Sequence, residues 1–396
     1  MRKYARRGAW WVAGVVAVAV VLAAAALTGR PPAVLAAAAR TGPAPAAPVL
    51  TGRALVTPAP FTHSAVDWTG STTIVAGLDN AGDLYYWWEP AGSSTFHQEL
   101  VATGLDVSGA PALGWTGSTV IIAAANGNQV DYWYQYAGTQ PWHEQPVATA
   151  AAGTTWGPAT IGWTGSSVII AAVDNNTNGN EADLYYWYEP AGTATWNQQL
   201  VSTSARDSWA YGPSIGWTGS TVIISVTDYY GWVDYWYQDA GTQPWHEQQL
   251  IPLTYGAPSF YGTSIAWTGS SVVIAATNFF GGLYYWYEPA GTTTWHEQYV
   301  GQDAAPVGYP AIAWTGSSVV IATMNAGSLD FWWQAAGTTP WHEEQVAALG
   351  TSSPGPSMIA APAAVLITVP DANGNLDLWW QLYGTTPWGE QEVAAG

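Results

Sequence analysis

Short runs of apolar residues, separated by Gly, Asn, Asp, Ser and Pro, dominate the chain from residue 61 to its end. The runs are rich in Val, Ile, Trp and Tyr, which are the residues that pack well on the pleated surface of a sheet. No long segment after residue 40 shows the 3.6-residue period of an amphipathic helix. The pattern therefore predicts an all-β protein made of many short strands.

These runs form a unit that recurs seven times. The string W-T-G-S marks six of the copies, at Trp68, Trp115, Trp163, Trp217, Trp267 and Trp314. A degenerate seventh copy aligns Ala361 with these tryptophans, and the successive spacings are 47, 48, 54, 50, 47 and 47 residues. In each unit a strand ending at the tryptophan is followed by a Val/Ile run, an aromatic run and a strand of the type W-H-E-Q-x-V. Each unit thus predicts four short strands with turns between them.

A four-stranded unit of about 40–50 residues is typical of the β-propeller, in which four to eight blades close into a ring. In the third strand of the first unit, alternation puts Leu84, Tyr86 and Trp88 on one face and Tyr85 and Trp87 on the other. Aromatic residues on both faces suit a sheet held between two neighbours. We therefore predict a seven-bladed β-propeller over residues 61–396, with four antiparallel strands in each blade.

The first 60 residues have a different composition. Residues 1–7 carry four positive charges and residues 8–29 carry none, which is the pattern of an export signal. The apolar stretch is longer than the ~7–15 residues of a cleaved signal and long enough, at ~18 or more, to span a bilayer. For residues 1–39, a cleaved signal peptide and an uncleaved signal anchor therefore both remain open. Residues 40–60 are rich in Ala and Pro and predict an extended linker.

Either fate of the first segment places the rest of the chain outside the cell. The propeller would be secreted, or anchored on the outer face of the cytoplasmic membrane through the N-terminal segment alone. Beyond Arg40 the chain carries two arginines against all 27 acidic residues, a formal charge of −25. Because such a field repels phosphate backbones and anionic lipid surfaces, we expect no nucleic-acid partner and no other membrane contact. The chain has no cysteine, so disulfides, a thiol nucleophile and zinc–thiolate sites are excluded.

Aromatic residues beside carboxylates and amides recur in every unit. This combination suits a sugar, because its C–H face can lie on an aromatic ring while its hydroxyls bind Glu, Gln or Asp. In each third strand a tryptophan is followed two residues later by Glu or Gln, which predicts a column of sugar-binding sites; packing between blades is the alternative interpretation of these tryptophans. The predicted pairs are Trp87 with Glu89, Trp133 with Gln135, Trp187 with Glu189, Trp236 with Gln238, Trp286 with Glu288, Trp332 with Gln334, and Trp379 with Gln381.

The sixth unit, P-A-I-A-W-T-G-S-S-V-V-I-A at 310–322 followed by G-S-L-D-F-W-W-Q at 327–334, has a Trp-containing fourth strand. It resembles the fucose-binding, tectonin-related seven-bladed propeller lectins of bacteria, and the resemblance covers residues 61–396. The family's Asp-Gly-Arg turn is replaced here by Thr-Gly-Ser, and its third-strand His by Tyr86, Tyr186 or Phe331. The resemblance implies the fold and the sugar-binding class, and no individual ligand contacts.

The segment 174–179, D-N-N-T-N-G, matches the opening of a calcium loop. It makes Asp174, Asn176 and Asn178 candidate ligands for Ca²⁺. The twelfth loop position, usually a bidentate Glu, is Tyr185, and a hairpin turn rich in Asn and Gly is the alternative interpretation.

Five of the six histidines share one column at the start of the fourth strand. Equivalent positions lie far apart around a ring, beyond the ~2 Å ligand distance of a shared metal, so we expect these side chains to be polar residues of the outer strands. They are His97, His143, His246, His296 and His342.

Catalysis has little support in the sequence. The residue before the W-T-G-S tryptophan, in the strand nearest the axis, is Gly or Ala in five units and Asp67 in the first. No pair of acids breaks the symmetry in the way that glycoside hydrolysis requires. We therefore predict an extracellular, multivalent carbohydrate-binding protein that is not an enzyme, with glycans or glycoconjugates as partners and no cofactor except possible Ca²⁺. A glycoside hydrolase on a propeller scaffold and a protein-binding scaffold without sugar affinity are the alternatives.

Overall fold

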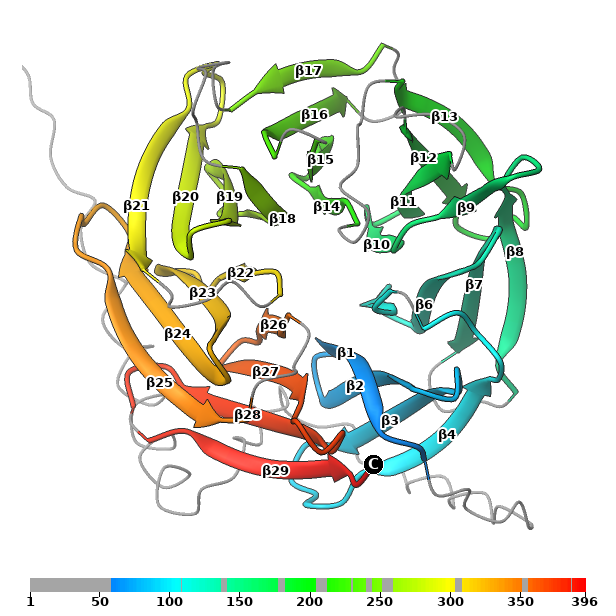
Figure 1. Cartoon of the computed structure of the whole chain (residues 1–396), viewed down its shortest axis with the longest axis horizontal. Helices are drawn as coiled ribbons and strands as arrows, with labels where there is room; N and C mark the ends of the chain where they lie inside the picture. The colour runs from blue at the N-terminus through cyan, green and yellow to red at the C-terminus, as the bar shows by residue number, and fades with distance from the viewer. Residues whose placement is uncertain are drawn as a thin grey trace, which may run out of the picture.

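The computed structural model is a ring of seven β-sheets around a central axis (Figure 1). It describes residues 58–396 except 108, 137–140, 177–181, 204–211, 229–230, 240–243, 251–258, 303–307, 351–354 and 386. The predicted signal or anchor at 1–39 and all but residues 58–60 of the predicted linker at 40–60 lie outside the described residues. In the part of the chain that is described, no helix is long and apolar enough to cross a membrane.

The blades follow the order of the chain. Blade 1 consists of β1 (Phe61–Trp68), β2 (Thr72–Asp79), β3 (Leu84–Pro90) and β4 (His97–Ala102). Blade 2 consists of β5 (Ala112–Trp115), β6 (Thr119–Asn126), β7 (Gln129–Tyr136) and β8 (His143–Thr149). Blade 3 consists of β10 (Thr160–Trp163), β11 (Ser167–Asn176), β12 (Ala182–Pro190) and β13 (Asn197–Ser202), with the short β9 (Thr154–Trp156) added beside β11.

The remaining blades repeat the arrangement. Blade 4 consists of β14 (Ser214–Trp217), β15 (Thr221–Thr227), β16 (Val233–Asp239) and β17 (His246–Gln249). Blade 5 consists of β18 (Phe260–Trp267), β19 (Ser271–Asn278), β20 (Gly282–Pro289) and β21 (His296–Gln302). Blade 6 consists of β22 (Ala311–Trp314), β23 (Ser318–Asn325), β24 (Ser328–Ala335) and β25 (His342–Ala348). Blade 7 consists of β26 (Ser357–Ala360), β27 (Ala364–Pro370), β28 (Leu376–Leu382) and β29 (Gly389–Ala394).

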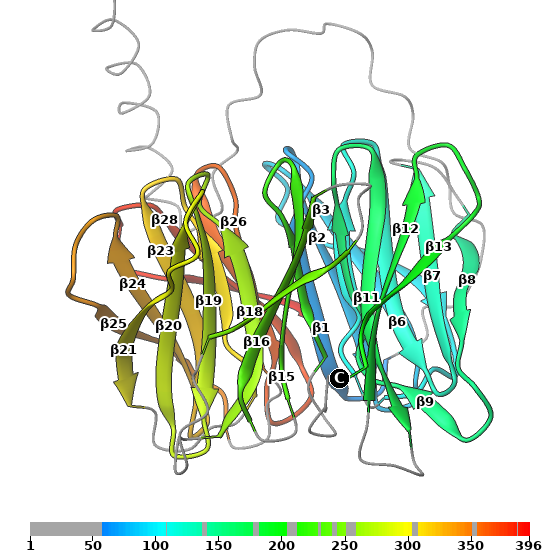
Figure 2. The same cartoon turned by 90° about the horizontal axis from the view of Figure 1, so that it is seen from above.

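Each blade pairs its four main strands antiparallel and in chain order. The strands run between the two faces of the ring (Figure 2). The predicted seven-bladed propeller with four antiparallel strands per blade is therefore confirmed. The fold follows from the sequence pattern because each Val/Ile run forms a second strand, buried between its two neighbours in the sheet and between two blades.

The register corrects the alignment of the seventh unit. In blades 2 to 6 the W-T-G-S tryptophan lies opposite the first Val of the second strand, as in the pair Trp314–Val319. In blade 7 the equivalent pair is Ala360–Val365, so Ala360 and not Ala361 takes the tryptophan position. The sequence alignment was wrong by one residue because two alanines stand side by side where the motif is absent.

The core lies between the blades and not within single sheets. The cluster at the junction of blades 5 and 6, for example, joins Val273 and Tyr285 of blade 5 to Ile312, Ile321 and Trp332 of blade 6. Equivalent clusters join the other blades. Each sheet therefore depends on its two neighbours for burial, which is the property expected of a stacked repeat.

Among the described residues, the ring closes by contacts between complete four-stranded blades, without exchange of a strand. Blade 1 lies beside blade 7, where Thr368 Oγ1 donates to Ser64 Oγ at 2.6 Å and the amide of Val66 donates to Ser357 Oγ at 3.1 Å. The amide of Phe61 donates to the carbonyl of Gly374 at 2.9 Å. Hydrogen bonds from strand to strand within one sheet do not cross this junction, so side chains and single backbone groups hold the two ends together.

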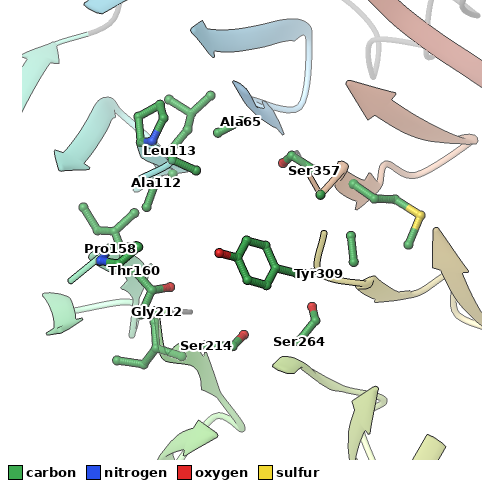
Figure 3. Close-up of a pocket in the computed structure, with 18 of the residues that line it drawn as sticks. Ala65, Ala112, Leu113, Pro158, Thr160, Gly212, Ser214, Ser264, Tyr309 and Ser357 are labelled. Atoms are coloured by element: carbon green, nitrogen blue, oxygen red, sulfur yellow. The ribbon is translucent and has the colours of Figure 1, made fainter. Parts of the chain in front are cut away.

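The first strands of the blades line a central channel with a volume of about 620 Å³. Figure 3 shows small residues and hydroxyls around it, among them Thr160, Ser214 and Ser264, with the ring of Tyr309 pointing into the open space. Gly262, at φ +46°, lets this ring lie close to the backbone, because a Cβ at residue 262 would overlap it. The channel is thus narrowed by one tyrosine, which lies just before the first strand of blade 6.

Candidate functional site

The tryptophans of the predicted sugar column are buried between blades. Trp87, Trp133, Trp187, Trp236, Trp286 and Trp379 are 1% exposed and Trp332 is 5% exposed. Each points into the junction with the preceding blade, as Trp286 does in the cluster that contains Ile223 and Tyr235 of blade 4. A buried indole offers no face to a sugar, so the alternative interpretation of this column, packing between blades, is the one that the structure supports.

The Glu and Gln residues of the same pairs form hydrogen bonds across the junctions. Gln135 Nε2 donates to Glu99 Oε2 at 2.8 Å, and Gln238 Nε2 donates to Gln199 Oε1 at 3.0 Å. The other bonds of this type are Gln334 to Gln298 at 2.9 Å, Gln381 to Glu344 at 3.2 Å, Gln145 to Glu189 at 3.1 Å, Gln391 to Glu89 at 3.2 Å, and Gln248 to Glu288. Every junction thus pairs one third-strand residue with one fourth-strand residue of the preceding blade.

These pairs contain at least one amide at every junction. Two carboxylates never face each other, because a glutamate on one side always meets a glutamine on the other. Burial raises the pKa of Glu89, Glu189 and Glu288, and the hydrogen bond from the partner glutamine opposes that shift. At three junctions a tryptophan before the fourth strand also donates to the shared acceptor, as Trp142 Nε1 does to Glu99 at 3.0 Å. At a fourth junction Trp295 Nε1 donates to Oε1 of Gln248, the glutamine that is bonded to Glu288.

An open cavity of about 300 Å³ lies at the junction of blades 6 and 7. Its apolar wall consists of Phe331 and Trp333 of blade 6 with two valines. Its polar groups include Glu344 of blade 6 and Gln381 of blade 7, and Tyr383 stands at its edge, 37% exposed. The full lining is Thr315, Ser317, Ser318, Val320, Phe331, Trp333, Glu344, Val365, Gln381, Tyr383, Gly384 and Thr385.

Packing fixes the position of the aromatic wall. The rings of Phe331 and Trp333 stack with centroids 6.0 Å apart, and Trp333 also stacks on His342 at 5.0 Å. Trp388 packs edge-on against Phe331 at 5.0 Å. Trp333 is therefore held between a neighbour on its own strand and one on the next, so that it presents a fixed aromatic surface to the cavity.

The polar side of the cavity keeps hydrogen-bonding capacity. Gln381 Nε2 donates to Glu344 Oε2 at 3.2 Å. A carboxylate has two oxygens and an amide has a carbonyl oxygen and two N–H donors, so one bond between them leaves acceptors and donors for a ligand. The hydroxyls of Thr315, Ser317 and Thr385 lie around the same space. The arrangement combines an aromatic face with a few polar groups, as ligand cavities commonly do.

Of the predicted site residues, Gln381 lines this cavity and its predicted partner Trp379 does not. Sequence reasoning missed Phe331, Trp333, Glu344 and Tyr383. Alternation puts Trp333 on the opposite face of β24 from Trp332, and the paired residues were sought on the Trp332 face. The signal that was available is the irregularity of the seventh unit, since Tyr383 takes a position that holds Ala336 in the sixth.

The predicted calcium ligands lie in and beyond β11. Asp174 is opposite Asp183 on β12 and Trp156 on β9, Asn176 is the last residue of β11, and Asn178 lies outside the described residues. Burial and the nearby Asp183 raise the pKa of Asp174. Among the residues that the structure describes, no three His, Cys, Asp or Glu side chains are grouped as metal ligands. Calcium binding stays a prediction.

The five histidines of the fourth strands are exposed, as expected, and each stacks on an aromatic ring of the third strand. The ring centroids are 4.8–5.1 Å apart in the pairs Trp88–His97, Tyr134–His143, Tyr237–His246, Tyr287–His296 and Trp333–His342. These side chains cover the aromatic rings at the outer strands of the blades.

The channel holds two ionisable groups of blade 1. Burial raises the pKa of Asp67 to about 6, against hydrogen bonds from the amides of Trp68 and Trp115. Burial lowers the pKa of His63 to about 4. The two residues stand near opposite ends of β1, four positions apart in the strand, so they do not form an acid–base pair across one small ligand.

Comparison with known proteins shows similarity in fold. The chain is similar to a lectin from Burkholderia pseudomallei, with a TM-score of 0.66 and 13% identity over 84% of this chain and 99% of that one. It is also similar to a mutant Aleuria aurantia lectin in complex with α-methyl-L-fucoside, with a TM-score of 0.50 and 14% identity over 74% of this chain and 98% of that one. The propeller domain of the trilobed protease from Pyrococcus furiosus matches with a TM-score of 0.52 and 11% identity, over 85% and 98%.

No family model matches the chain, and no curated protein matches it. The resemblance to propeller lectins that the repeats indicate is confirmed as a distant one, carried by the fold.

Proposed function

We propose that this chain is an extracellular carbohydrate-binding protein and that the cavity between blades 6 and 7 receives a sugar. The observation that carries the proposal is the combination of the aromatic wall of Phe331 and Trp333 with the Glu344–Gln381 pair in one space of about 300 Å³. An aromatic wall suits the C–H face of a sugar ring, and the pair suits its hydroxyls. The similarity in fold to lectins, one of them in complex with α-methyl-L-fucoside, supports the same class.

The signal peptide or signal anchor predicted for residues 1–39 supports the extracellular location. The sugar in the cavity would be neutral, because Glu344 and the formal charge of −25 beyond Arg40 repel an acidic one. The volume lies at the lower end of the ~300–1,000 Å³ of ligand sites, which suits a single sugar ring. For a single small site we expect a dissociation constant of about 1 mM, or −4 kcal/mol.

A glycan array followed by titration tests the proposal. The purified chain is screened on an array, and neutral methyl glycosides, starting with α-methyl-L-fucoside, are then titrated by calorimetry. We expect Trp333→Ala to abolish binding and Trp88→Ala to leave it unchanged. Trp88 is the matched control because it holds the equivalent place in blade 1 and also stacks on a histidine.

Glu344→Gln is the second variant. It creates a Gln–Gln pair like the native pair of Gln298 and Gln334, so the fold should persist while a charged acceptor is lost. We expect weaker binding, by about tenfold, since hydrogen bonds to charged groups contribute about 1.5–3 kcal/mol. Absence of binding to any glycan, or equal loss in the Trp88 and Trp333 variants, would contradict the proposal.

A further inference from the structure

The W-T-G-S tryptophans pack in the junctions between blades. Trp115 of blade 2 packs on a cluster that contains Ile74 and Tyr86 of blade 1, together with Trp88. By strand register, these three residues of blade 1 correspond to Val320, Phe331 and Trp333 of blade 6. The same three residues of blade 6 line the open cavity. The indole of Trp115 therefore packs on the blade 1 residues that correspond to the apolar wall of the open cavity between blades 6 and 7.

The other junctions repeat this packing. Trp314 packs on the cluster of Val273 and Tyr285, beside Tyr287, at the junction of blades 5 and 6. The remaining tryptophans of the motif pack on the corresponding clusters at their own junctions, namely Trp68, Trp163, Trp217 and Trp267. In the described part of the chain, six of the seven junctions thus carry a half-buried indole at this position.

Blade 7 departs from the repeat at two places that meet. Ala360 stands where the other blades have tryptophan, and it packs beside the cluster of blades 6 and 7. Tyr383 stands where blade 6 has Ala336, and its hydroxyl donates to the carbonyl of Ala361. The first change removes an indole from the junction, and the second adds an aromatic wall at the rim of the space so formed.

We infer that the W-T-G-S tryptophan closes a blade junction to ligands, and that the ring therefore binds one uncharged sugar unit, at the junction where Ala360 replaces it. The inference rests on the proposed function for the nature of the ligand, and it replaces the seven equivalent sites expected from the third-strand column. The number of sugar sites is then set by how many blades lack the motif tryptophan, and not by the number of blades. An isolated ring then gains no avidity from its seven-fold symmetry, since avidity needs several sites that engage together.

Ala360→Trp tests the inference because it restores the residue of the other six blades. We expect the indole to fill the cavity, so that the affinity for α-methyl-L-fucoside, or for the neutral methyl glycoside that binds best, falls more than tenfold. We also expect a higher melting temperature without any sugar, because a void is replaced by packed apolar surface. Where Tyr383 obstructs the indole, the double variant Ala360→Trp with Tyr383→Ala, which restores the blade 6 residues at both positions, should show both effects.

Trp314→Ala is the matched control. It removes an indole from the neighbouring junction and leaves the cavity of blades 6 and 7 intact, so the calorimetric affinity at the native site should stay within twofold. Wild type should bind one sugar per chain, and glucuronate should not bind. If sugars instead stack on the six partly exposed tryptophans, the stoichiometry will be near six and Trp314→Ala will lower it, which overturns the inference.

The outcomes separate this inference from the proposed function. Unchanged sugar affinity in both Ala360 variants overturns the inference while the protein remains a sugar binder. A melting temperature lowered in both variants shows that an indole does not fit the space, and it overturns the inference even if no sugar binds. Failure of every neutral methyl glycoside to bind wild type, with a raised melting temperature in the Ala360 variants, contradicts the proposed function alone.

Discussion

Replacing Gln135 with glutamate should place a second carboxylate in a buried junction. Gln135 Nε2 lies 2.8 Å from Glu99 Oε2 and its side chain is 5% exposed. Two unit charges at this 2.8 Å separation repel by about 6 kcal/mol at an effective dielectric constant of about 20. The pair can avoid this repulsion by holding one proton. Against an ordinary glutamate pKa of ~4.3, keeping that proton at pH 7 costs about 4 kcal/mol.

The expected loss of unfolding free energy is therefore about 4 kcal/mol at pH 7. At pH 5 the same proton costs only about 1 kcal/mol, so most of the loss should disappear. Equilibrium unfolding in urea at the two pH values measures the difference through the midpoint and slope of the transition.

Gln238→Glu is the matched control. Gln238 is 2% exposed and faces Gln199 instead of a glutamate, so the variant creates a Gln–Glu pair like the native pair of Gln248 and Glu288. We expect this variant to lower the unfolding free energy by no more than about 1–2 kcal/mol, because the new carboxylate at position 238 can accept a hydrogen bond from the amide of Gln199. Equal losses in the two variants, or a loss in Gln135→Glu that persists at pH 5, would refute the view that amides are placed to keep carboxylates apart.

Three further predictions follow from the buried residues. Trp286→Ala should lower the unfolding free energy by about 3–5 kcal/mol, measured by urea titration, because Trp286 is 1% exposed and its Nε1 donates to Glu297 at 3.0 Å. An unchanged stability together with lost sugar binding would instead support the prediction that the third-strand tryptophans bind sugar. If the Asp174 loop binds calcium, a chelator should lower the melting temperature, and identical curves would leave only the hairpin. Burial raises the pKa of Asp234 to about 8, so this carboxyl binds a proton more tightly in the folded protein than in the unfolded chain, and stability should rise as pH falls from about 9 to 5. Burial lowers the pKa of His63 to about 4, and this group opposes the gain in stability below pH ~6.5. A melting temperature that decreases steadily as the pH is lowered from 9 to 6.5 would contradict the assignment.

The fold was predictable because the apolar runs, the turn residues and the seven-fold repetition all indicate the same architecture. The Val/Ile run of every unit must be buried on both faces, and a run such as 318–323 becomes a strand between two neighbours in its sheet. The Thr-Gly-Ser turn fixes the register, since Thr315 Oγ1 accepts the amide of Ser318 at 3.0 Å and Gly316 takes φ +91°. Seven repetitions of these local choices leave little freedom in the architecture.

The site was not predictable in the same way. Period-two alternation shows that Trp332 and Gln334 share a face, but it does not show that the preceding blade covers that face completely. Burial of Trp332 depends on residues such as Tyr285, some 47 positions earlier. Likewise, two adjacent alanines in the seventh unit gave no means of choosing the tryptophan position. The hydrogen bond from the Tyr383 amide to Ala363, matching that from Ala336 to Ser317, decides it in favour of Ala360.

In this ring, repeated residues serve packing between blades, whereas a binding site needs a junction where the repeat is interrupted. A residue that recurs in all seven blades, such as the third-strand tryptophan, occurs in the same environment seven times, and that environment is a junction that must be filled for the sheets to associate. A ligand site requires space and unsatisfied polar groups, which the same junction cannot supply while it is filled. Space therefore arises where one blade breaks the pattern, as Ala360 and Tyr383 do beside the apolar wall of Phe331 and Trp333. In such a repeat protein, the positions that differ from their equivalents are the better guide to function, and the positions that recur are the better guide to fold.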